Sequence, residues 1–289
     1  MWAIYAFLSA FFVAATDPIA KKTLSTHGDE YLVSWLMLFL STPFLAIYYF
    51  SHRIAPFNSD LVKTLLTVIP LEILATILYY KALKLTDISL SVPFLALTPV
   101  FVILTAYLLL GEHIPIRGIF GIALITFGAY SLNLKEVRYG FISPIKAILS
   151  NRGSIYMVLV ALIFSVTSAV AKKAMLCSSP ESIPFIYNLS ISFAMVPLVL
   201  YRLSKGYSMI TKDPKTILSY LVLGLLAALS SICFFKSVST ANVAYAISIK
   251  RLSLLMSVGY GWIFFREREI RIRLTSTFCM FLGAILIII

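Results

Sequence analysis

Residues 2–22, WAIYAFLSAFFVAATDPIAKK, form the apolar stretch from which the architecture of this protein can be inferred. No charged side chain precedes Asp17 in this stretch, and two lysines close it. An apolar run of about 20 residues is long enough to cross the hydrocarbon core of a bilayer as an α-helix. Because the run lacks the cationic segment that opens a secretory signal peptide, we expect it to remain part of the folded protein.

The same stretch recurs at residues 153–173, GSIYMVLVALIFSVTSAVAKK. Both copies carry an Ile-Tyr pair near the start and Ala-Lys-Lys at the end. A second alignment pairs the residues from Tyr79 onward with those from Phe234 onward, and it places Glu112 opposite Glu267. Internal repetition on this scale predicts a chain built from two related halves.

The composition also indicates a membrane-embedded chain. Hydrophobic residues make up 60% of the chain and charged residues 12%, whereas soluble domains carry roughly 25% charged residues. Inside a bilayer only helices and closed barrels satisfy their backbone polar groups, and uninterrupted apolar runs of about 20 residues favour helices. We therefore predict an all-α integral membrane protein with ten transmembrane helices. The predicted spans are residues 2–22, 31–50, 61–81, 88–110, 116–134, 154–175, 182–203, 216–236, 242–265 and 273–289.

The longest gap between predicted spans divides the chain into two halves of five spans each. We expect a first repeat at residues 1–134, a connecting loop at residues 135–153 and a second repeat at residues 154–289. Because five is odd, the second repeat would start on the opposite side of the membrane from the first. Inverted-topology repeats of this kind hold the substrate site near the bilayer midplane, between the halves.

Basic residues give the chain a net charge of +12, but they lie mostly between the apolar spans. Cationic side chains at such positions meet lipid headgroups, so we expect membrane lipid and not nucleic acid as a partner. The Lys and Arg residues are divided unequally between the two sides of the predicted membrane, and because cytoplasmic loops carry the excess of positive charge, this distribution favours both termini outside the cell. Because Cys177, Cys233 and Cys279 have no metal-binding or redox spacing, we expect no metal and no cofactor.

A known family has a similar pattern of residues. The residues that carry the similarity are Ala82-Leu83-Lys84, Pro93, Pro99, Leu110-Gly111-Glu112, Gly118, Gly121 and Gly128. The pattern resembles the EamA domain, the repeated unit of ten-helix carriers in the drug/metabolite transporter superfamily. The second copy departs from it, because Arg266 replaces the glycine before Glu267, and Ser248 and Leu254 replace the prolines. The resemblance implies export or exchange of small organic solutes, with both termini usually inside the cell.

Lys250 and Arg251 are the strongest candidates for a substrate site. They lie eight or nine residues into the span 242–265, which is roughly 12–14 Å along a helix axis and close to the midplane. Charges at that depth cost roughly 2.5–3.5 kcal/mol on insertion scales and usually mark function. The aligned Leu95 and Ala96 are uncharged, so the fold itself does not require the pair. An anion is the natural ligand, and the alternative is that the pair forms an internal ion pair or reaches a water-filled crevice.

The segment around this pair resembles the ninth helix of sugar-phosphate/phosphate translocators, which belong to the same superfamily. The similarity is carried by Ile249-Lys250-Arg251 and Phe264-Phe265-Arg266. In those carriers a Lys-Arg pair binds the phosphate group of the substrate. The resemblance therefore implies that Lys250 and Arg251 bind an anionic group.

Four further residues complete the predicted substrate site. Glu72, near the middle of the third span, is either a proton-coupling group or a counter-ion of the cationic pair. Asn188 and Tyr187 in the seventh span, and Trp35 in the second, would supply polar or stacking contacts. Asp17, late in the first span, is expected at the membrane interface and not in a cavity.

Structural roles are expected for the repeated charges and for one glycine-rich helix face. Lys21 and Lys172 close their apolar runs, so we expect them to anchor helices among lipid headgroups. Glu112 and Glu267 would fall on opposite faces of inverted halves, so we expect them in networks near helix ends. The three glycines of the span 116–134 share one face and are expected to pack within the chain.

The predicted function is secondary active transport of a small organic solute by alternating access, as an exporter or exchanger of an anionic or amphipathic metabolite. The alternatives are a membrane-embedded enzyme acting on a lipid or prenyl substrate, and a scaffold or lipid-handling protein without transport activity. The three histidines lie near loops without an Asp-rich motif, and no phosphate-binding loop sequence is present. We expect a multi-pass protein of the cell membrane, monomeric or homodimeric, with a small-molecule substrate.

Overall fold

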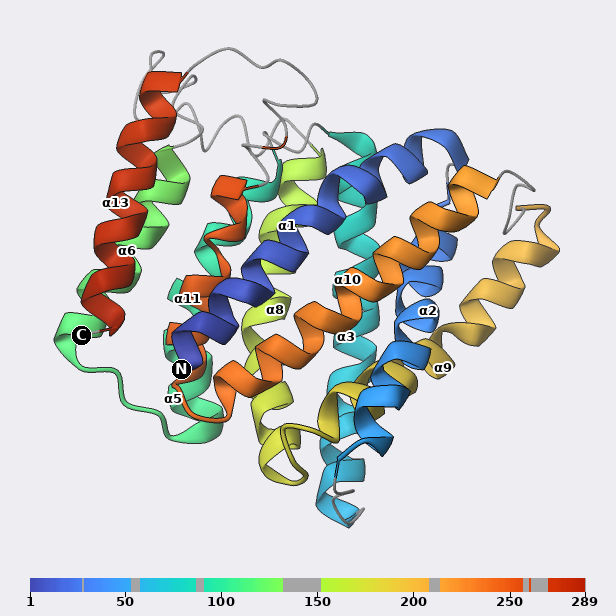
Figure 1. Cartoon of the computed structure of the whole chain (residues 1–289), viewed down its shortest axis with the longest axis horizontal. Helices are drawn as coiled ribbons and strands as arrows, with labels where there is room; N and C mark the ends of the chain where they lie inside the picture. Colours follow the sequence, from blue (N-terminus) through green and yellow to red (C-terminus); the bar gives the residue numbers. More distant parts are fainter. Residues whose placement is uncertain are drawn as a thin grey trace.

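A computed structural model describes residues 1–27, 29–52, 58–86, 91–131, 152–207, 214–256, 260 and 270–288, and these residues form a bundle of helices (Figure 1). In this part of the chain, six helices are long and apolar enough to cross a membrane. They are α1 (Trp2–His27), α2 (Glu30–Phe50), α3 (Ser59–Leu85), α8 (Arg152–Leu176), α9 (Ile183–Ser204) and α10 (Pro214–Val238).

Five further elements belong to the described part of the bundle. They are the 3-10 helix η1 (Val92–Leu97) and the α-helices α5 (Thr98–Leu110), α6 (Ile116–Ser131), α11 (Val243–Lys250) and α13 (Ile270–Ile288). The prediction of an all-α chain is confirmed for the described residues. The prediction of ten full-length spans is not confirmed, because only six of the described helices are long and apolar enough to cross a membrane. The fourth and ninth predicted spans are interrupted, and the apolar helices in the fifth and tenth are shorter.

The two interruptions lie at aligned places in the two halves. In the first half, η1 gives way to α5 at Thr98, and Pro99 occupies the first turn of α5. Proline lacks a backbone N–H and is tolerated in a first turn but not further inside a helix. In the second half, α11 ends at Lys250, and Arg251 and Leu252 form a turn. Interrupted helices near the midplane build the substrate sites of many secondary transporters.

Contacts between helix ends show how the helices alternate in direction. At one end of the bundle, Lys236 near the end of α10 lies over the ring of Tyr5 near the start of α1, 5.6 Å from the ring centroid. At the other end, Lys84 in the last turn of α3 pairs with Glu30 at the start of α2, with Nζ and Oε2 3.1 Å apart. We call the end that holds the start of α1 the N-terminal face, and the other end the opposite face.

The repeated lysines make the same hydrogen bond in each half, at different faces. Nζ of Lys21 donates to the backbone oxygen of Thr86, just after α3, at 3.0 Å. Nζ of the aligned Lys172 donates to the backbone oxygen of Ala241, just after α10, at 2.7 Å. Since α3 ends at the opposite face and α10 ends at the N-terminal face, equivalent parts of the two halves point in opposite directions.

The contact between α6 and α13 depends on glycine, and Figure 1 shows these two helices side by side. A Cβ atom on Gly283 of α13 would lie 2.6 Å from the backbone oxygen of Gly121 on α6. A Cβ atom on Gly121 would lie 2.9 Å from the backbone oxygen of Gly283. The expectation that the glycine face of α6 packs within the chain is therefore confirmed for Gly121.

Gly283→Ala is expected to lower the free energy of unfolding by about 1–3 kcal/mol, because the added methyl group overpacks a backbone contact. Thermal unfolding in detergent measures the change. Leu66→Ala on α3, which shortens a side chain 67% exposed, is the control and is expected to move the midpoint little. Equal midpoints for Gly283→Ala and the unmodified protein would contradict the need for a glycine.

Candidate functional site

A cavity of about 240 Å³ lies between the two halves. Residues of α1, α2, α3 and η1 line it from the first half, and residues of α8, α9, α10 and α11 line it from the second. This volume is suitable for a small solute.

Among the residues that the structure describes, four charged side chains line the cavity. Asp17 on α1 and Glu72 on α3 come from the first half. Lys250 and Arg251, at the end of α11, come from the second half. The residue aligned with each of them is uncharged. These aligned residues are Ser168, Ala227, Leu95 and Ala96, of which the first three also line the cavity.

The guanidinium group of Arg251 connects the two interrupted spans. Its Nη2 atom donates to Oγ1 of Thr98, the first residue of α5, at 2.9 Å. Arg251 is only 5% exposed, and its buried Nε atom has no hydrogen-bond partner in the part of the chain that the structure describes. The guanidinium group is therefore held by Thr98, and its Nε donor is buried without an acceptor among the described residues.

Lys250 reaches the cavity from a different side. Its Nζ atom lies 4.5 Å from the ring centroid of Phe234 on α10, which is within the range of a cation–π contact. Phe234 also lines the cavity. Adjacent residues of a helix point about 100° apart, which explains why Lys250 lies over α10 while Arg251 reaches α5.

Glu72 has one carboxylate oxygen without a partner. The side chains of Thr167 on α8 and Tyr187 on α9 interact with its carboxyl group. Its Oε2 atom is buried and accepts no hydrogen bond from the described residues. Lys250 acts on Glu72 electrostatically, but within the described ranges no ion pair of 4.0 Å or less joins Glu72 to Lys250 or Arg251.

Asp17 lies in the cavity, so the expectation of an interfacial position is wrong. The helix continues beyond it to His27, and Asp17 is 2% exposed. The hydroxyl group of Tyr79 on α3 donates to Oδ1 of Asp17 at 2.5 Å. Sequence reasoning missed Tyr79 altogether, whereas the carboxylate within an apolar run was a signal that could have placed Asp17 in the site.

The other predicted site residues fall into two groups. Tyr187 and Asn188 on α9 line the cavity, and Nδ2 of Asn188 donates to Oγ of Ser231 on α10 at 2.9 Å. Trp35 on α2 is not among the described residues that line it. Instead, Nε1 of Trp35 donates to the backbone oxygen of Ser192 on α9 at 3.0 Å, which connects α2 with α9.

At the N-terminal face, Glu112 joins the two halves. Its Oε1 atom accepts a hydrogen bond from Nζ of Lys172 at 2.5 Å, and its Oε2 atom accepts one from the backbone N–H of Val243, the first residue of α11, at 2.9 Å. The structural role expected for Glu112 is confirmed. Headgroup anchoring is wrong for Lys172, whose side chain is 12% exposed and ion-paired. Glu267, the counterpart of Glu112, lies outside the described residues.

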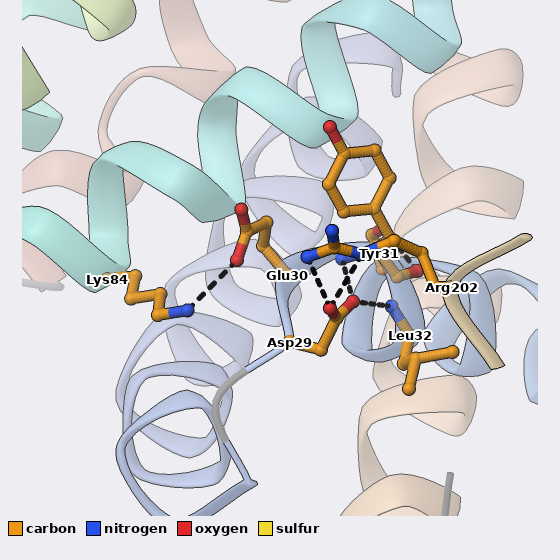
Figure 2. A network of polar contacts seen from close by, with 7 residues as sticks. Asp29, Glu30, Tyr31, Leu32, Lys84 and Arg202 are labelled. Carbon is orange, nitrogen blue, oxygen red and sulfur yellow. Dashed lines mark hydrogen bonds and ion pairs between the residues drawn. The ribbon is translucent and has the colours of Figure 1, made fainter. Parts of the chain in front are cut away.

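At the opposite face, Asp29 joins the two halves (Figure 2). Oδ1 of Asp29 caps α2 by accepting hydrogen bonds from the backbone N–H groups of the first turn. Its Oδ2 atom accepts one from Nε of Arg202, near the end of α9, at 2.8 Å. The neighbouring Glu30 pairs with Lys84 within the first half, as Figure 2 shows. Each face thus has a carboxylate of the first half bound to a cation of the second half.

Comparison with known proteins identifies the family. Residues 1–134 and 151–289 match the EamA-like transporter family. A solved crystal structure of another protein has the same fold as this chain, with a TM-score of 0.75 and 14% sequence identity. The similarity covers 100% of this chain and 98% of that chain. None of the curated protein sequences matches this chain. The chain belongs to the EamA-like transporter family and is a multi-pass membrane transporter of small solutes.

Proposed function

We propose that this protein is a secondary active carrier of a small organic solute with an anionic group, and that it moves the solute across the cell membrane by alternating access. The observation that carries the proposal is the position of Lys250 and Arg251, which line the cavity between the halves where α11 ends. Cations within a membrane are costly, so their place in a cavity of solute size favours a role in binding.

An anion suits these two side chains chemically. The guanidinium group of Arg251 is a planar fork that matches carboxylate and phosphate, and the ammonium group of Lys250 is a point charge. Thr98 occupies Nη2 of Arg251, whereas Nε has no acceptor in the described part of the chain. A bound anion would complete the hydrogen bonding of a guanidinium group that is already oriented.

Polar contacts at both faces support alternating access. The pair of Lys172 with Glu112 at the N-terminal face, and that of Arg202 with Asp29 at the opposite face, each connect one half to the other. For the cavity to open at one face, the pair at that face has to separate while the other pair holds. Opening at one face at a time moves a solute without a continuous pore, in the way that rocking inverted repeats do.

Transport in proteoliposomes tests the proposed function. Thermal stabilisation of the purified protein by a panel of small carboxylates and phosphate monoesters first selects a solute. The radiolabelled solute is then supplied to liposomes loaded with the unlabelled compound. We expect saturable uptake that the internal solute accelerates, with protein-free liposomes as the background. Chemical conversion of the solute would indicate an enzyme, and the absence of flux for every stabilising solute would contradict a carrier.

A further inference from the structure

The charges of the cavity are divided between the halves. Both carboxylates, Asp17 and Glu72, belong to the first half, and both cations, Lys250 and Arg251, belong to the second. Because the aligned residues are uncharged, the repeat does not impose this division. Among the described residues, the first half therefore contributes two carboxylates to the cavity and the second half two cations, and we call these two parts of the lining the acidic wall and the basic wall.

One group on each wall has hydrogen-bonding capacity that the described residues do not use. Nε of Arg251 is a buried donor without an acceptor, and Oε2 of Glu72 is a buried acceptor without a donor. Buried polar groups are nearly always paired, because leaving one unpaired costs free energy. A solute that brings an acceptor to Arg251 and a donor to Glu72 would satisfy both.

The other two charged groups already contact neighbouring side chains, one through a hydrogen bond and one through a cation–π contact. Tyr79 donates to Oδ1 of Asp17 at 2.5 Å, and the ammonium group of Lys250 lies over the ring of Phe234. Glu72 is therefore the acidic residue best placed to receive a donor from the solute. Lys250 contributes charge beside Arg251, which directs the anionic end of a solute to the basic wall.

We propose that the substrate is a zwitterion whose anionic group binds Arg251 and Lys250 and whose ammonium group binds Glu72. The proposal rests on the transport function proposed above and narrows its substrate class. A simple anion would leave Oε2 of Glu72 unpaired and would meet a like charge there. A simple cation would leave Nε of Arg251 without an acceptor and would meet a like charge there. A zwitterion avoids both, because its two charges match the two walls.

The volume and the aromatic lining limit the rest of the solute. A cavity of about 240 Å³ holds a molecule with a short carbon skeleton. Phe164, Phe234 and Phe235 line it, and their rings would contact the apolar part of the solute between or beside its charged groups.

Matched triplets of compounds test the proposal on the purified full-length protein. Each triplet holds a zwitterion, the same skeleton without the amino group, and the same skeleton without the acidic group. The triplets are phenylalanine, 3-phenylpropanoate and phenethylamine; 5-aminopentanoate, pentanoate and butylamine; and 2-aminoethyl phosphate, ethyl phosphate and ethylamine. Affinity is measured from the concentration dependence of thermal stabilisation. In at least one triplet, we expect the zwitterion to bind about tenfold to a hundredfold more tightly than either relative.

Glu72→Gln connects this preference to one residue. In this variant, we expect the zwitterion and its deaminated relative to bind with equal affinity. Asp60→Asn removes an exposed carboxylate from the same helix and is expected to keep the preference of the unmodified protein. The comparison within each triplet uses the unmodified protein and does not depend on whether the variant folds.

The outcomes separate the substrate class from the transport function. If no zwitterion binds more tightly than its deaminated relative, the proposed substrate class is wrong, and carriage of an anion still stands if that relative shows flux in proteoliposomes. If the preference persists in Glu72→Gln, the assignment of the ammonium group to Glu72 is wrong. A stabilising zwitterion that shows no flux would contradict the carrier function while leaving the binding site in place.

Discussion

Arg251→Met is expected to weaken solute binding by roughly thirtyfold to several thousandfold, since removing one partner of a buried charged contact costs about 2–5 kcal/mol. Concentration-dependent thermal stabilisation and uptake into proteoliposomes measure the loss. Without solute, the unfolding midpoint is expected to change little, because loss of the hydrogen bond to Thr98 and removal of a buried charge have opposite effects on stability. This combination distinguishes a binding residue from one that holds the fold together.

Two control variants make this prediction sharper. Thr98→Val removes the hydrogen bond to Nη2 of Arg251 but keeps the charge, so we expect a smaller loss of affinity than in Arg251→Met. Lys236→Met removes a cation that lies over Tyr5 and not in the cavity lining, and it is expected to retain transport, whereas Lys250→Met is expected to lose it. Unchanged uptake by Arg251→Met and Lys250→Met together would remove the pair from the substrate site.

Glu112→Gln and Asp29→Asn are expected to shift the carrier in opposite directions. Each variant neutralises a carboxylate that ties the halves together at one face, so the state open at that face becomes more populated. Removing one partner of a buried ion pair costs about 3–5 kcal/mol, and partial exposure of Arg202 lowers that figure at the opposite face. We expect the population to change by about tenfold or more in each case.

Labelling of a cysteine in the cavity measures this shift. Ala227→Cys, in a background without the native cysteines, places a thiol on the lining, and a membrane-impermeant maleimide is applied to vesicles of each orientation. Glu112→Gln should raise labelling from the N-terminal face and lower it from the opposite face, and Asp29→Asn should do the reverse. Asparagine still caps α2, so the Asp29 variant removes the charge and keeps the helix start.

Glu30→Gln is the matched control for Asp29→Asn. Glu30 pairs with Lys84 within the first half, so neutralising it leaves the connection between the halves intact. Labelling of Glu30→Gln is therefore expected to resemble that of the unmodified protein from both faces. Equal shifts in Glu30→Gln and Asp29→Asn would mean that loss of any carboxylate loosens this face, which contradicts a specific role for the pair of Asp29 and Arg202.

The sequence was informative where charge or repetition stood out against an apolar background. The repeated Ala-Lys-Lys endings indicated two halves, and the equivalent bonds of Lys21 and Lys172 lie at different faces. Lys250 and Arg251 were noticeable because a cationic pair far inside an apolar span is expensive. The cost of placing charge inside an apolar span limited the positions that Lys250 and Arg251 could occupy.

Features that depend on contacts between distant segments were not predictable from the sequence. The chain places Asp17 late in an apolar run, and only the packing of α1 against α3 brings Tyr79 to it. Trp35 was a reasonable cavity residue by type, but the direction of its side chain depends on α9. The interruption of the fourth span at Thr98 follows from Pro99 only when neighbouring helices accept the freed backbone groups.

The lysine–carbonyl bond that occurs once in each half has a consequence for the energetics of the transport cycle. Lys21 with Thr86 and Lys172 with Ala241 are copies of one local structure at different ends of the bundle. In the proposed carrier, an inward-open and an outward-open form can then be built from the same local structures, with the two halves exchanging conformations. These shared local structures would contribute equally to both forms, so a difference in free energy between the forms would come from what the halves do not share, such as the charged residues of the cavity.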